Sequence, residues 1–559
     1  MGESQMDVET LLGRRNTDRW NRVAVGDMLE RCAGSEPHKI ALVATPEAVA
    51  DGRYARVTYA QANDIATRVA NGLLAQGLAR GDRVAMLVEN SVEAYLAKMG
   101  IAKAGLVAAP INTMLAPDVV RYALEHVGAR VAIVDSGLWD SGGEGFRAAG
   151  VTPLVAIGGR EEALPDGAAG FADFIAAQDT AEPEVQIHGD DIWQILMTSG
   201  TTSMPKAVMI SHTYSYFAAY GFAVSASRGV AVESDLCMFS FLPVVYHIGD
   251  HAYLLSTFLV GGTIVLGRGF DARAAGETVT REKVTTLWAG SPQFLTAIAA
   301  AAEASGGAVD LSSLEVIIYG WAALSPALVA QVRQLCGGRV EFVGIFGQTE
   351  AIACHRFWPN RWPELHGRTA PGTNYVGTPA PNLATILLDE SGALIPPENT
   401  GADGEAVYRS PAMMSGYYRD ADATRAAFEH GWFHSGDLCR YGEGGLRIMV
   451  DRYKDVVKSG GENVSSIRVE SVLHEHPAVA RAAVVGVPDE RWGEAVTAVV
   501  IPAAEKTPEE AELIAFCRER LAGYETPKKI VFVDELPTTV GSKILKYRLR
   551  EQLRSGELA

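Results

Sequence analysis

A hydroxyl-rich turn that ends in a lysine has the composition of a phosphate-binding loop. The apolar run Trp193–Met197 before it is typical of a strand. Backbone amides and hydroxyls in such a turn can surround an anion, and the lysine adds a positive charge. The candidate phosphate ligands are Thr198, Ser199, Gly200, Thr201, Thr202, Ser203 and Lys206. A Ser/Thr/Gly cluster alone is more often a surface loop, so nucleotide chemistry is at this point a hypothesis.

Two later motifs each supply a carboxylate. The strand-like run Val340–Ile345 leads into a hydroxyl and a carboxylate of the kind that hold phosphate and Mg²⁺. The residues of this motif are Phe346, Gly347, Gln348, Thr349 and Glu350. Further on, Asp437 follows a tight Ser-Gly turn, where a carboxylate can accept hydrogen bonds from both hydroxyls of a ribose.

Two segments near the C-terminus combine cations with glycine turns. The first contains Arg452, Lys458, the pair Gly460-Gly461 and Glu462, and its glycines permit close approach of the backbone to a ligand. The second presents Lys543 after a glycine-bearing turn. Each motif alone is as readily explained by turn chemistry or by a solvated charge. Five such motifs in this order are not expected by chance.

With these motifs the chain resembles the adenylate-forming superfamily, which includes acyl-CoA and aryl-CoA synthetases, luciferases and peptide-synthetase adenylation domains. The resemblance covers nearly the whole chain. Residues 198–207 match the phosphate loop T-S-G-[ST]-T-G-x-P-K-G, except that Ser203 and Ala207 stand where glycines are usual. Ser203 and the segment 459–464 are most similar to the carnitine and medium-chain acyl-CoA ligase-like branch.

The resemblance implies ATP, coenzyme A (CoA) and Mg²⁺ as ligands, and it assigns roles to the first motifs. The loop at 198–206 would hold the departing phosphates, and Thr349 would contact the α-phosphate. Glu350 would hold Mg²⁺, while Asp437 and Arg452 would bind the ribose. No protein nucleophile is required, because the carboxylic acid itself attacks ATP and the thiol of CoA attacks the resulting acyl-adenylate.

The resemblance also assigns the remaining motifs. Lys543 would bridge the acyl carboxylate and the phosphate during adenylation. His247, at the end of the run Leu242–His247, would lie beside the acyl pocket, although a core histidine is equally expected there. Gly460 and Gly461 would line the tunnel for the pantetheine arm of CoA, with Lys458 and Glu462 beside them.

Alternating helical and strand-like segments must position these motifs, and they predict an α/β fold. Residues Tyr59–Gln76 and Val92–Ala104 have helical spacing of apolar positions. Residues Arg83–Leu87, Gly105–Pro110 and Val131–Val134 are typical of buried parallel strands.

The chain is too long for one ordinary domain, and the resemblance implies two of unequal size. A large multi-subdomain N-terminal domain with layered sheets and helices, residues 1–450, would bind AMP and the acyl group. A small mobile α+β domain, residues 451–559, would rotate about Asp451 so that one site serves both half-reactions. The Gly-rich turn 441–445 precedes this boundary.

Composition excludes several other classes. A net charge of -18 argues against nucleic acid as a partner. The six cysteines form no C-x-x-C pair, so neither a zinc site nor a disulfide framework is predicted. The N-terminus lacks the pattern of a signal peptide, and no apolar run approaches the roughly 18 residues of a membrane span. We therefore expect a cytoplasmic protein without a membrane span, and a homodimer only by analogy.

These features predict a carboxylic acid:CoA ligase, an ATP-dependent enzyme that makes an acyl-adenylate and then a thioester. The changes at Ser203 and Ala207 and the altered turn before Lys543 leave open a thiolation-only enzyme that accepts a preformed acyl-adenylate. A carrier protein could replace CoA as acceptor, because both present the same phosphopantetheine arm. A catalytically silent nucleotide-binding protein is the third alternative.

Two aromatic features bear on the acid, which the sequence does not identify. Trp321 stands where a small residue is usual in the family, and it would reshape the wall of the acyl and adenine site. The insert Trp358–Pro363 could line a pocket, but packing on the surface is the favoured interpretation.

Overall fold

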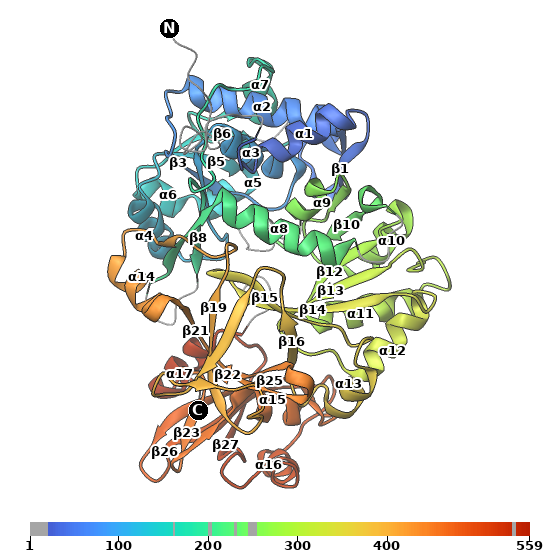
Figure 1. Cartoon of the computed structure of the whole chain (residues 1–559), viewed down its shortest axis with the longest axis vertical. Coiled ribbons are helices and arrows are strands. Elements are labelled where there is room, and N and C mark those ends of the chain that lie inside the picture. Colours follow the sequence, from blue (N-terminus) through green and yellow to red (C-terminus); the bar gives the residue numbers. More distant parts are fainter. Residues whose placement is uncertain are drawn as a thin grey trace, which may run out of the picture.

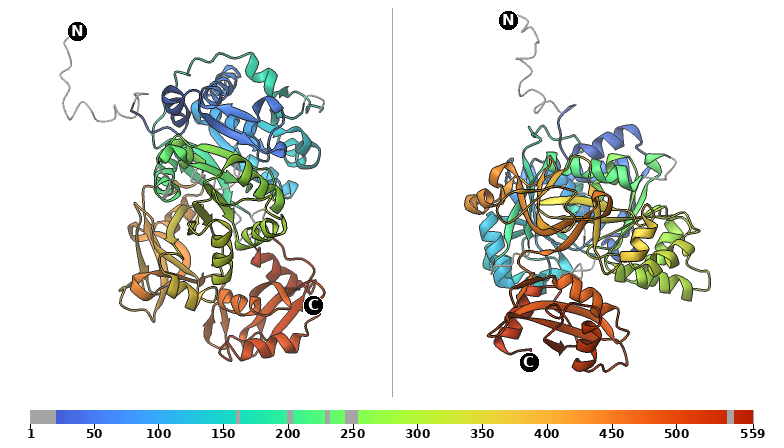
Figure 2. Two further views of the ribbon diagram at one scale, coloured as in Figure 1. Left: turned by 90° about the vertical axis from the view of Figure 1, so that its right-hand side faces the viewer. Right: turned by 60° about the horizontal axis from the view of Figure 1, so that its bottom comes forward.

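The computed structural model describes residues 21–159, 163–198, 204–227, 232–243, 254–538 and 544–558, without the side chains of residues 233, 353 and 354. A large N-terminal domain contains two extended sheets, and a small C-terminal domain lies below it in Figure 1. Both views of Figure 2 show the same division. The predicted α/β fold with two domains of unequal size is confirmed.

The first sheet of the large domain contains the predicted buried strands. Its strand order is β20-β9-β8-β4-β3-β5-β6-β7. The strands are β3 (Arg83–Leu87), β4 (Val107–Pro110), β5 (Val131–Asp135), β6 (Thr152–Ile157), β7 (Ala169–Gly170), β8 (Ile192–Thr198), β9 (Lys206–Ser211) and β20 (Gly416–Tyr417). Strands β3, β4 and β5 are parallel, as expected from their continuous apolar runs.

The second sheet of the large domain is longer and changes character along its length. Its order is β18-β17-β19-β21-β22-β16-β15-β14-β13-β12-β10-β11-β1-β2. The strands are β1 (Ile40–Ala44), β2 (Arg56–Thr58), β10 (Cys237–Ser240), β11 (Thr263–Leu266), β12 (Thr286–Gly290), β13 (Val316–Tyr319), β14 (Glu341–Gln348), β15 (Ala351–Phe357), β16 (Tyr375–Pro379), β17 (Ala384–Leu388), β18 (Leu394–Ile395), β19 (Asp403–Arg409), β21 (Phe433–Tyr441) and β22 (Arg447–Arg452). Pairs from β1 and β11 through β14 are parallel, and pairs from β14 to β18 are antiparallel.

The C-terminal domain has a sheet and hydrophobic clusters of its own. Its strands are β23 (Val457–Ser459), β24 (Glu462–Val464), β25 (Val479–Asp489), β26 (Gly493–Pro502) and β27 (Lys529–Phe532). Helices α15 (Ser466–His474), α16 (Glu510–Arg518) and α17 (Lys546–Ser555) pack on this sheet. Buried Val469, Val484 and Leu513 belong to one cluster, and Leu549 of α17 belongs to another.

The helices of the large domain cover both of its sheets. They are α1 (Asp27–Ser35), α2 (Tyr59–Ala75), α3 (Val92–Lys103), α4 (Pro117–Val127), α5 (Ser136–Gly142), α6 (Glu144–Ala148), α7 (Phe171–Ala176), α8 (His212–Ala226), α9 (Leu255–Leu259), α10 (Ala272–Glu282), α11 (Pro292–Ala304), α12 (Pro326–Leu335), α13 (Pro363–Thr369) and α14 (Ala421–Ala427). Helix α2 begins at a capping box in which Thr58 and Gln61 exchange hydrogen bonds. Among the described residues, no helix is both long enough and apolar enough to cross a membrane.

Candidate functional site

Strand pairing brings the two ends of the predicted phosphate loop together. Thr198 ends β8 and faces Lys206 at the start of β9 across an antiparallel pair. The Thr198 hydroxyl donates to the Lys206 carbonyl oxygen at 3.3 Å. The loop residues Ser199, Gly200, Thr201, Thr202 and Ser203 lie outside the described part of the chain. The Lys206 ammonium is 4.4 Å from the ring centroid of Tyr417, so it lies at the edge of β20.

The second motif is the tip of a β-hairpin. Gln348 of β14 pairs with Ala351 of β15, which leaves Thr349 and Glu350 as the two residues of the turn. The Tyr214 hydroxyl on α8 braces this tip: it donates to the Thr349 carbonyl oxygen at 3.1 Å and accepts from the Ile352 amide at 3.0 Å. Beside the tip, Phe346 contacts His355, with ring centroids 6.2 Å apart, and Gly347 is exposed.

Tyr417 joins the phosphate loop to the hairpin. Its hydroxyl donates to Glu350 Oε1 at 3.0 Å, while its ring carries the Lys206 ammonium. Burial and the nearby Glu350 carboxylate raise the pKa of Tyr417, so its phenol remains a hydrogen-bond donor. A cation, a carboxylate and an aromatic hydroxyl from three separate segments thus meet at one place.

An ion pair between β21 and β22 lies near the hairpin. Asp437 of β21 is 1% exposed, and it faces Arg452 of β22, whose Nε is 3.2 Å from Asp437 Oδ1. The Asp437 charge raises the pKa of Arg452 against the effect of burial, and Glu350 adds to the rise. Gln348 links the two regions by donating to the Ser435 carbonyl oxygen at 3.2 Å.

Glu405 supports the turn that carries Asp437. Its two carboxylate oxygens accept from the Gly436 amide at 2.9 Å and bond His434 Nδ1 at 2.8 Å. Gly436 has a φ of 70°, which favours glycine at this position. The turn is therefore held by a carboxylate that lies 32 positions earlier than Asp437 in the chain, on β19.

The Gly-Gly-Glu motif belongs to the sheet of the C-terminal domain. Ser459 pairs with Glu462, so Gly460 and Gly461 form a two-residue hairpin turn, with φ values of 63° and 87°. The Gly460 amide donates to the Trp492 carbonyl oxygen at 2.7 Å, and a Cβ at Gly460 would lie 3.2 Å from the Trp492 ring. Lys458 and Glu462 are exposed beside the turn.

Two predicted residues fall outside the described structure. Lys543 lies in the segment 539–543, and His247 lies in the segment 244–253. An isolated bridge between Thr538 and Ile544 brings together the two ends of the segment that carries Lys543. The predicted roles of both residues stay predictions.

The two aromatic features of the sequence, Trp321 and the insert Trp358–Pro363, lie in different surroundings. Trp321 is 41% exposed with a φ of 65°, and its ring lies 5.7 Å from that of Trp288, so a bulky side chain occupies a left-handed backbone position. In the insert, the Trp362 ring stacks on Phe357 at 5.6 Å within a small hydrophobic cluster. The insert packs on the body of the domain, as the sequence favoured.

Sequence reasoning missed three supporting residues: Tyr214, Glu405 and Tyr417. Tyr214 lies in a helix whose apolar pattern predicts only a core residue, and Glu405 lies in a strand without any catalytic motif. Tyr214 and Glu405 reach the site through the packing of strands and helices, which a local sequence pattern does not predict. The pair Tyr417-Tyr418 after Gly416 was the one local signal available for Tyr417.

Comparisons with known proteins identify the family of the chain. Residues 29–418 match the family model of the AMP-binding enzyme, and residues 468–543 match that of the AMP-binding enzyme C-terminal domain. A feruloyl-CoA synthase from Amycolatopsis sp. is 36% identical over 501 residues, which are 89% of this chain and 94% of that protein. A fatty acid–[acyl-carrier-protein] ligase from Streptomyces coeruleorubidus is 33% identical over 516 residues, 91% of this chain and 93% of that one.

A solved structure extends the likeness to both domains. An anthranilate CoA ligase in complex with anthranoyl-AMP has a TM-score of 0.81 and 28% sequence identity, and the match covers 96% of this chain and 98% of that chain. The chain therefore belongs to the AMP-binding enzyme family of the adenylate-forming superfamily, as an ATP-dependent, AMP-forming acyl-CoA ligase that joins a carboxylic acid to CoA through an acyl-adenylate.

Proposed function

We propose that adenylation takes place where Lys206, Glu350 and Asp437 converge in the large domain. The observation that carries this proposal is the position of Tyr417, whose hydroxyl binds Glu350 while its ring carries Lys206. The phosphate loop, the hairpin tip and β20 are thereby held together. The Asp437–Arg452 pair lies beside them, within electrostatic reach of Glu350.

Each group has a role that suits its chemistry. Thr198, Lys206 and the loop between them surround the β- and γ-phosphates, and Thr349 contacts the α-phosphate. Preorganised donors and a cation stabilise charge on the departing pyrophosphate. Asp437 and Arg452 bind the ribose hydroxyls, Arg452 also holds Asp437 in place, and Phe346 and Gly347 lie along the adenine.

Glu350 is the proposed ligand for Mg²⁺. Among the described residues no cluster of three or more metal-ligating side chains exists, and one carboxylate at the hairpin tip is what the site offers. This donor set fits Mg²⁺, which keeps several waters and is usually held by one or two carboxylates together with substrate phosphates. When bound, the ion would neutralise phosphate charge.

The C-terminal domain, proposed as residues 451–559, supplies most of the remaining groups, and the large domain supplies His247. Lys543 bridges the acyl carboxylate and the α-phosphate in adenylation, and His247 lies beside the acyl group. After rotation about Asp451, Gly460 and Gly461 line the path of the pantetheine arm, with Lys458 and Glu462 beside it. The exposed Gly-Gly turn supports this role, because bare backbone permits close approach of a narrow thiol arm.

A carrier protein is a second candidate for the thiol acceptor. The relative from Streptomyces coeruleorubidus is named as a ligase that loads an acyl carrier protein, and it matches this chain nearly end to end. A carrier presents the same phosphopantetheine thiol as CoA. A homodimer and a cytoplasmic location are likewise proposals, made by analogy and from the composition.

The test separates the two half-reactions. A panel of carboxylic acids is incubated with ATP and Mg²⁺, with and without CoA, and release of AMP and pyrophosphate is measured; synthetic acyl-adenylates with CoA are assayed in parallel. We expect acid-dependent AMP release that yields acyl-CoA. Thioester formation from acyl-adenylates without any ATP consumption would instead support a thiolation-only enzyme. If a thioester formed only when a carrier protein was supplied in place of CoA, the carrier protein would be the acceptor.

Variants sharpen the same test. Lys543→Ala is expected to lower AMP formation by at least about 100-fold, because it removes a positive charge that stabilises the transition state. Thioester formation from acyl-adenylate should persist. Lys506→Ala, an exposed lysine of the same domain, is the matched control. Equal losses in both half-reactions would contradict the assignment of Lys543.

A further inference from the structure

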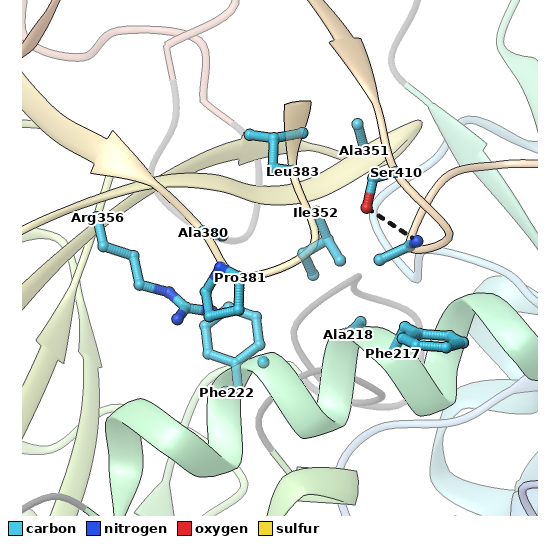
Figure 3. Close-up of a pocket in the computed structure, with 12 residues that line it drawn as sticks. Phe217, Ala218, Phe222, Ala351, Ile352, Arg356, Ala380, Pro381, Leu383 and Ser410 are labelled. Carbon is cyan, nitrogen blue, oxygen red and sulfur yellow. Dashed lines mark hydrogen bonds between the residues drawn. The ribbon is translucent and has the colours of Figure 1, made fainter. Parts of the chain in front are cut away.

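Two hollows in the large domain differ greatly in size. The crevice between α8 and β15, where Arg356 lies against Phe222 (Figure 3), leaves about 20 Å³, the space of one water molecule. A second hollow, at the first sheet of the large domain, has a volume of about 440 Å³. That volume is typical of small-molecule pockets, so the second hollow has room for an organic ligand and the crevice does not.

The larger hollow, which we call the strand-end cavity, lies at the amino ends of parallel strands. It is lined by Arg83, Val107 and Ile192, the first residues of β3, β4 and β8. Strand β8 ends at Thr198, six residues after Ile192, which is roughly 20 Å away at about 3.3 Å per residue. The strand-end cavity is therefore separate from the proposed phosphate loop, which begins at the other end of β8.

The floor of the strand-end cavity is apolar. Val107 and Ile195 are buried in the hydrophobic cluster to which α4 contributes, and Ile192 packs against that cluster. Arg83 marks the end of α4, because its Nε donates to the carbonyl oxygen of Val127, the last residue of the helix, at 2.7 Å. Beyond this end of α4, an apolar part of the sheet faces the cavity.

The rim of the cavity carries hydrogen-bond donors that are not fully used. Arg80, Arg83 and Asp191 are lining residues. Arg80 binds the Asp191 carboxylate through Nε at 2.9 Å and through Nη2 at 2.5 Å. Its Nη1 has no hydrogen-bond partner in the part of the chain that the structure describes, and the side chain is 42% exposed. Arg80 can therefore donate to a ligand without giving up its ion pair.

The charges around the cavity favour an anion. Its lining residues include two arginines and one carboxylate, so their net charge is positive. Arg419 adds a cation beside the wall, with its guanidinium carbon 5.1 Å from the ring centroid of Tyr418. This charge offsets the carboxylate of Asp82, which is 3.9 Å from Arg83 Nη1 and is not a lining residue.

We propose that the strand-end cavity is a second binding site for a small carboxylic acid with an apolar body. The carboxylate accepts hydrogen bonds from Arg80 and Arg83, since a guanidinium matches a planar carboxylate in shape and charge. The body of the acid covers Val107, Ile192 and Ile195 and removes their apolar surface from water. An acid is also the substrate class of this ligase, so the site would let a carboxylic acid act on its own enzyme.

The walls of the cavity connect it with the proposed adenylation site. Met209 lines it from β9, three residues after Lys206, and Tyr418 lines it directly after Tyr417. The Tyr418 amide donates to the Ala207 carbonyl oxygen at 2.8 Å. An acid against Met209 and Tyr418 would hold β9 and β20 together, and with them Lys206 on the Tyr417 ring. We expect it to raise the affinity for ATP; this effect rests on the proposed adenylation site, whereas binding of the acid does not.

Calorimetry with the catalytic site blocked tests the binding. The protein is saturated with the acyl-sulfamoyl-adenosine of the acid that the substrate panel identifies, and octanoate or 1-octanol is then titrated. Arg80→Met with Asp191→Asn removes the rim pair without leaving a carboxylate unpaired, and Ile192→Phe narrows the cavity without changing a charge. Arg53→Met with Asp51→Asn, which removes an Arg–Asp pair outside the cavity, is the matched control. Melting temperatures show that each variant is folded.

The wild type is expected to bind one octanoate per chain beside the blocking ligand. It should bind octanoate at least about 10-fold more tightly than octanol, because the carboxylate accepts charge-assisted hydrogen bonds. The rim variant should lose about 10-fold or more in octanoate affinity with little change for octanol, and Ile192→Phe should lose affinity for both. The control should bind both as the wild type does.

Three results would overturn the inference: no octanoate bound beside the blocking ligand, equal affinities for octanoate and octanol, or binding that neither cavity variant changes. A panel that identifies no acid would overturn the proposed adenylation function by itself. The titration would then be run without the blocking ligand, and the cavity variants would decide it as before.

The coupling has its own measurement. The affinity for α,β-methylene-ATP, a non-reacting analogue, is measured with and without octanoate. We expect octanoate to raise it by about 5-fold or more in the wild type and by less in Ile192→Phe, in the usual range for coupled sites. An equal rise in both proteins would place the effect in the catalytic site and overturn the coupling, while the binding site itself would stand.

Discussion

Two buried aspartates lie at neighbouring positions of the β21–β22 pair, and their side chains bind different kinds of partner. Asp437 lies opposite Arg452, and Leu438 lies opposite Asp451. Asp437 and Asp451 are each 1% exposed. Asp437 pairs with Arg452 at 3.2 Å across β21 and β22, beside the hairpin tip. Asp451 Oδ2 instead accepts from both the amide and the hydroxyl of Ser466, each at 2.6 Å, at the start of the C-terminal helix α15.

The contacts around Asp451 continue into the C-terminal domain. The Ser466 hydroxyl also accepts from Lys546 Nζ at 2.6 Å, and Lys546 lies 2.8 Å from Glu470. Burial lowers the pKa of Lys546, but the carboxylates of Glu470, Asp451 and Asp455 outweigh burial and leave it raised. Neighbouring residues of β22 thus have different roles. Arg452 contacts Asp437 in the proposed ligand site, and Asp451 binds Ser466 of the C-terminal domain. The roles of these two chemically similar carboxylates therefore depend on the residues that they bind.

The largest expected effect comes from Asp437→Asn. The change removes the negative charge that would bind the ribose and that faces Arg452. We expect kcat/KM for ATP to fall by about 100- to 1,000-fold, since two hydrogen bonds to a charged group are weakened. The free energy of unfolding should fall less, and both are measured by steady-state kinetics and urea denaturation. Asp422→Asn, an exposed residue of α14, is the control. A loss of stability with an unchanged KM for ATP would place Asp437 with Asp451 as an anchor.

Lys546→Met should show the opposite pattern. It removes the partner of Glu470, and both side chains are largely buried, at 13% and 15% exposure. A buried carboxylate left without its partner costs about 3–5 kcal/mol of stability. Adenylation at saturating substrates should change little where the protein remains folded. Unfolding followed by denaturation measures the first expectation and AMP release the second. A large loss of adenylation at unchanged stability would contradict an anchoring role.

Tyr417→Phe sharpens the ligand side of the comparison. The variant keeps the ring beside Lys206 and removes the hydroxyl that donates to Glu350. One hydrogen bond is worth about 1 kcal/mol, so we expect a fall of roughly 3- to 10-fold in kcat for adenylation. The dependence on Mg²⁺ concentration should also shift, because Glu350 becomes less constrained. Tyr418→Phe is the matched control, and equal effects of the two variants would exclude a specific role for the Tyr417 hydroxyl.

Much of the fold and the identity of the site motifs were predictable from sequence, because both depend on local patterns. The apolar runs at Arg83–Leu87 and Val131–Val134 predicted the parallel strands, and motif order predicted Glu350 and Asp437 as site residues, which stay predictions. The partners were not predictable. Tyr417 reaches Glu350 across 67 positions and Glu405 reaches Gly436 across 31, through strand pairings that no local pattern specifies. The attachment of Asp451 to Ser466 also required the three-dimensional structure.

The smallest expected effect concerns a buried histidine that is separate from both aspartates, and it appears only in the pH dependence of stability. His355 is fully buried, and neither ring nitrogen has a hydrogen-bond partner among the described residues. Burial, with the charge of Arg447, holds the pKa of His355 well below its usual value. The unfolded chain takes up a proton near pH 6.5 and the folded chain does not, so stability falls as the pH drops below about 6.5.

The same sign applies to His212, whose pKa is lowered to about 3 by burial and whose Nδ1 accepts from the Val25 amide. Each histidine contributes up to about 1.4 kcal/mol of stability loss per pH unit between pH 6 and pH 4.5. His355→Leu, of similar volume, should remove one such contribution, so the slope of unfolding free energy against pH becomes shallower while the His212 contribution remains. Denaturation curves at four pH values measure the slope. An unchanged slope would mean that His355 takes up its proton in the folded protein, which would require an acceptor for that charge inside the second sheet.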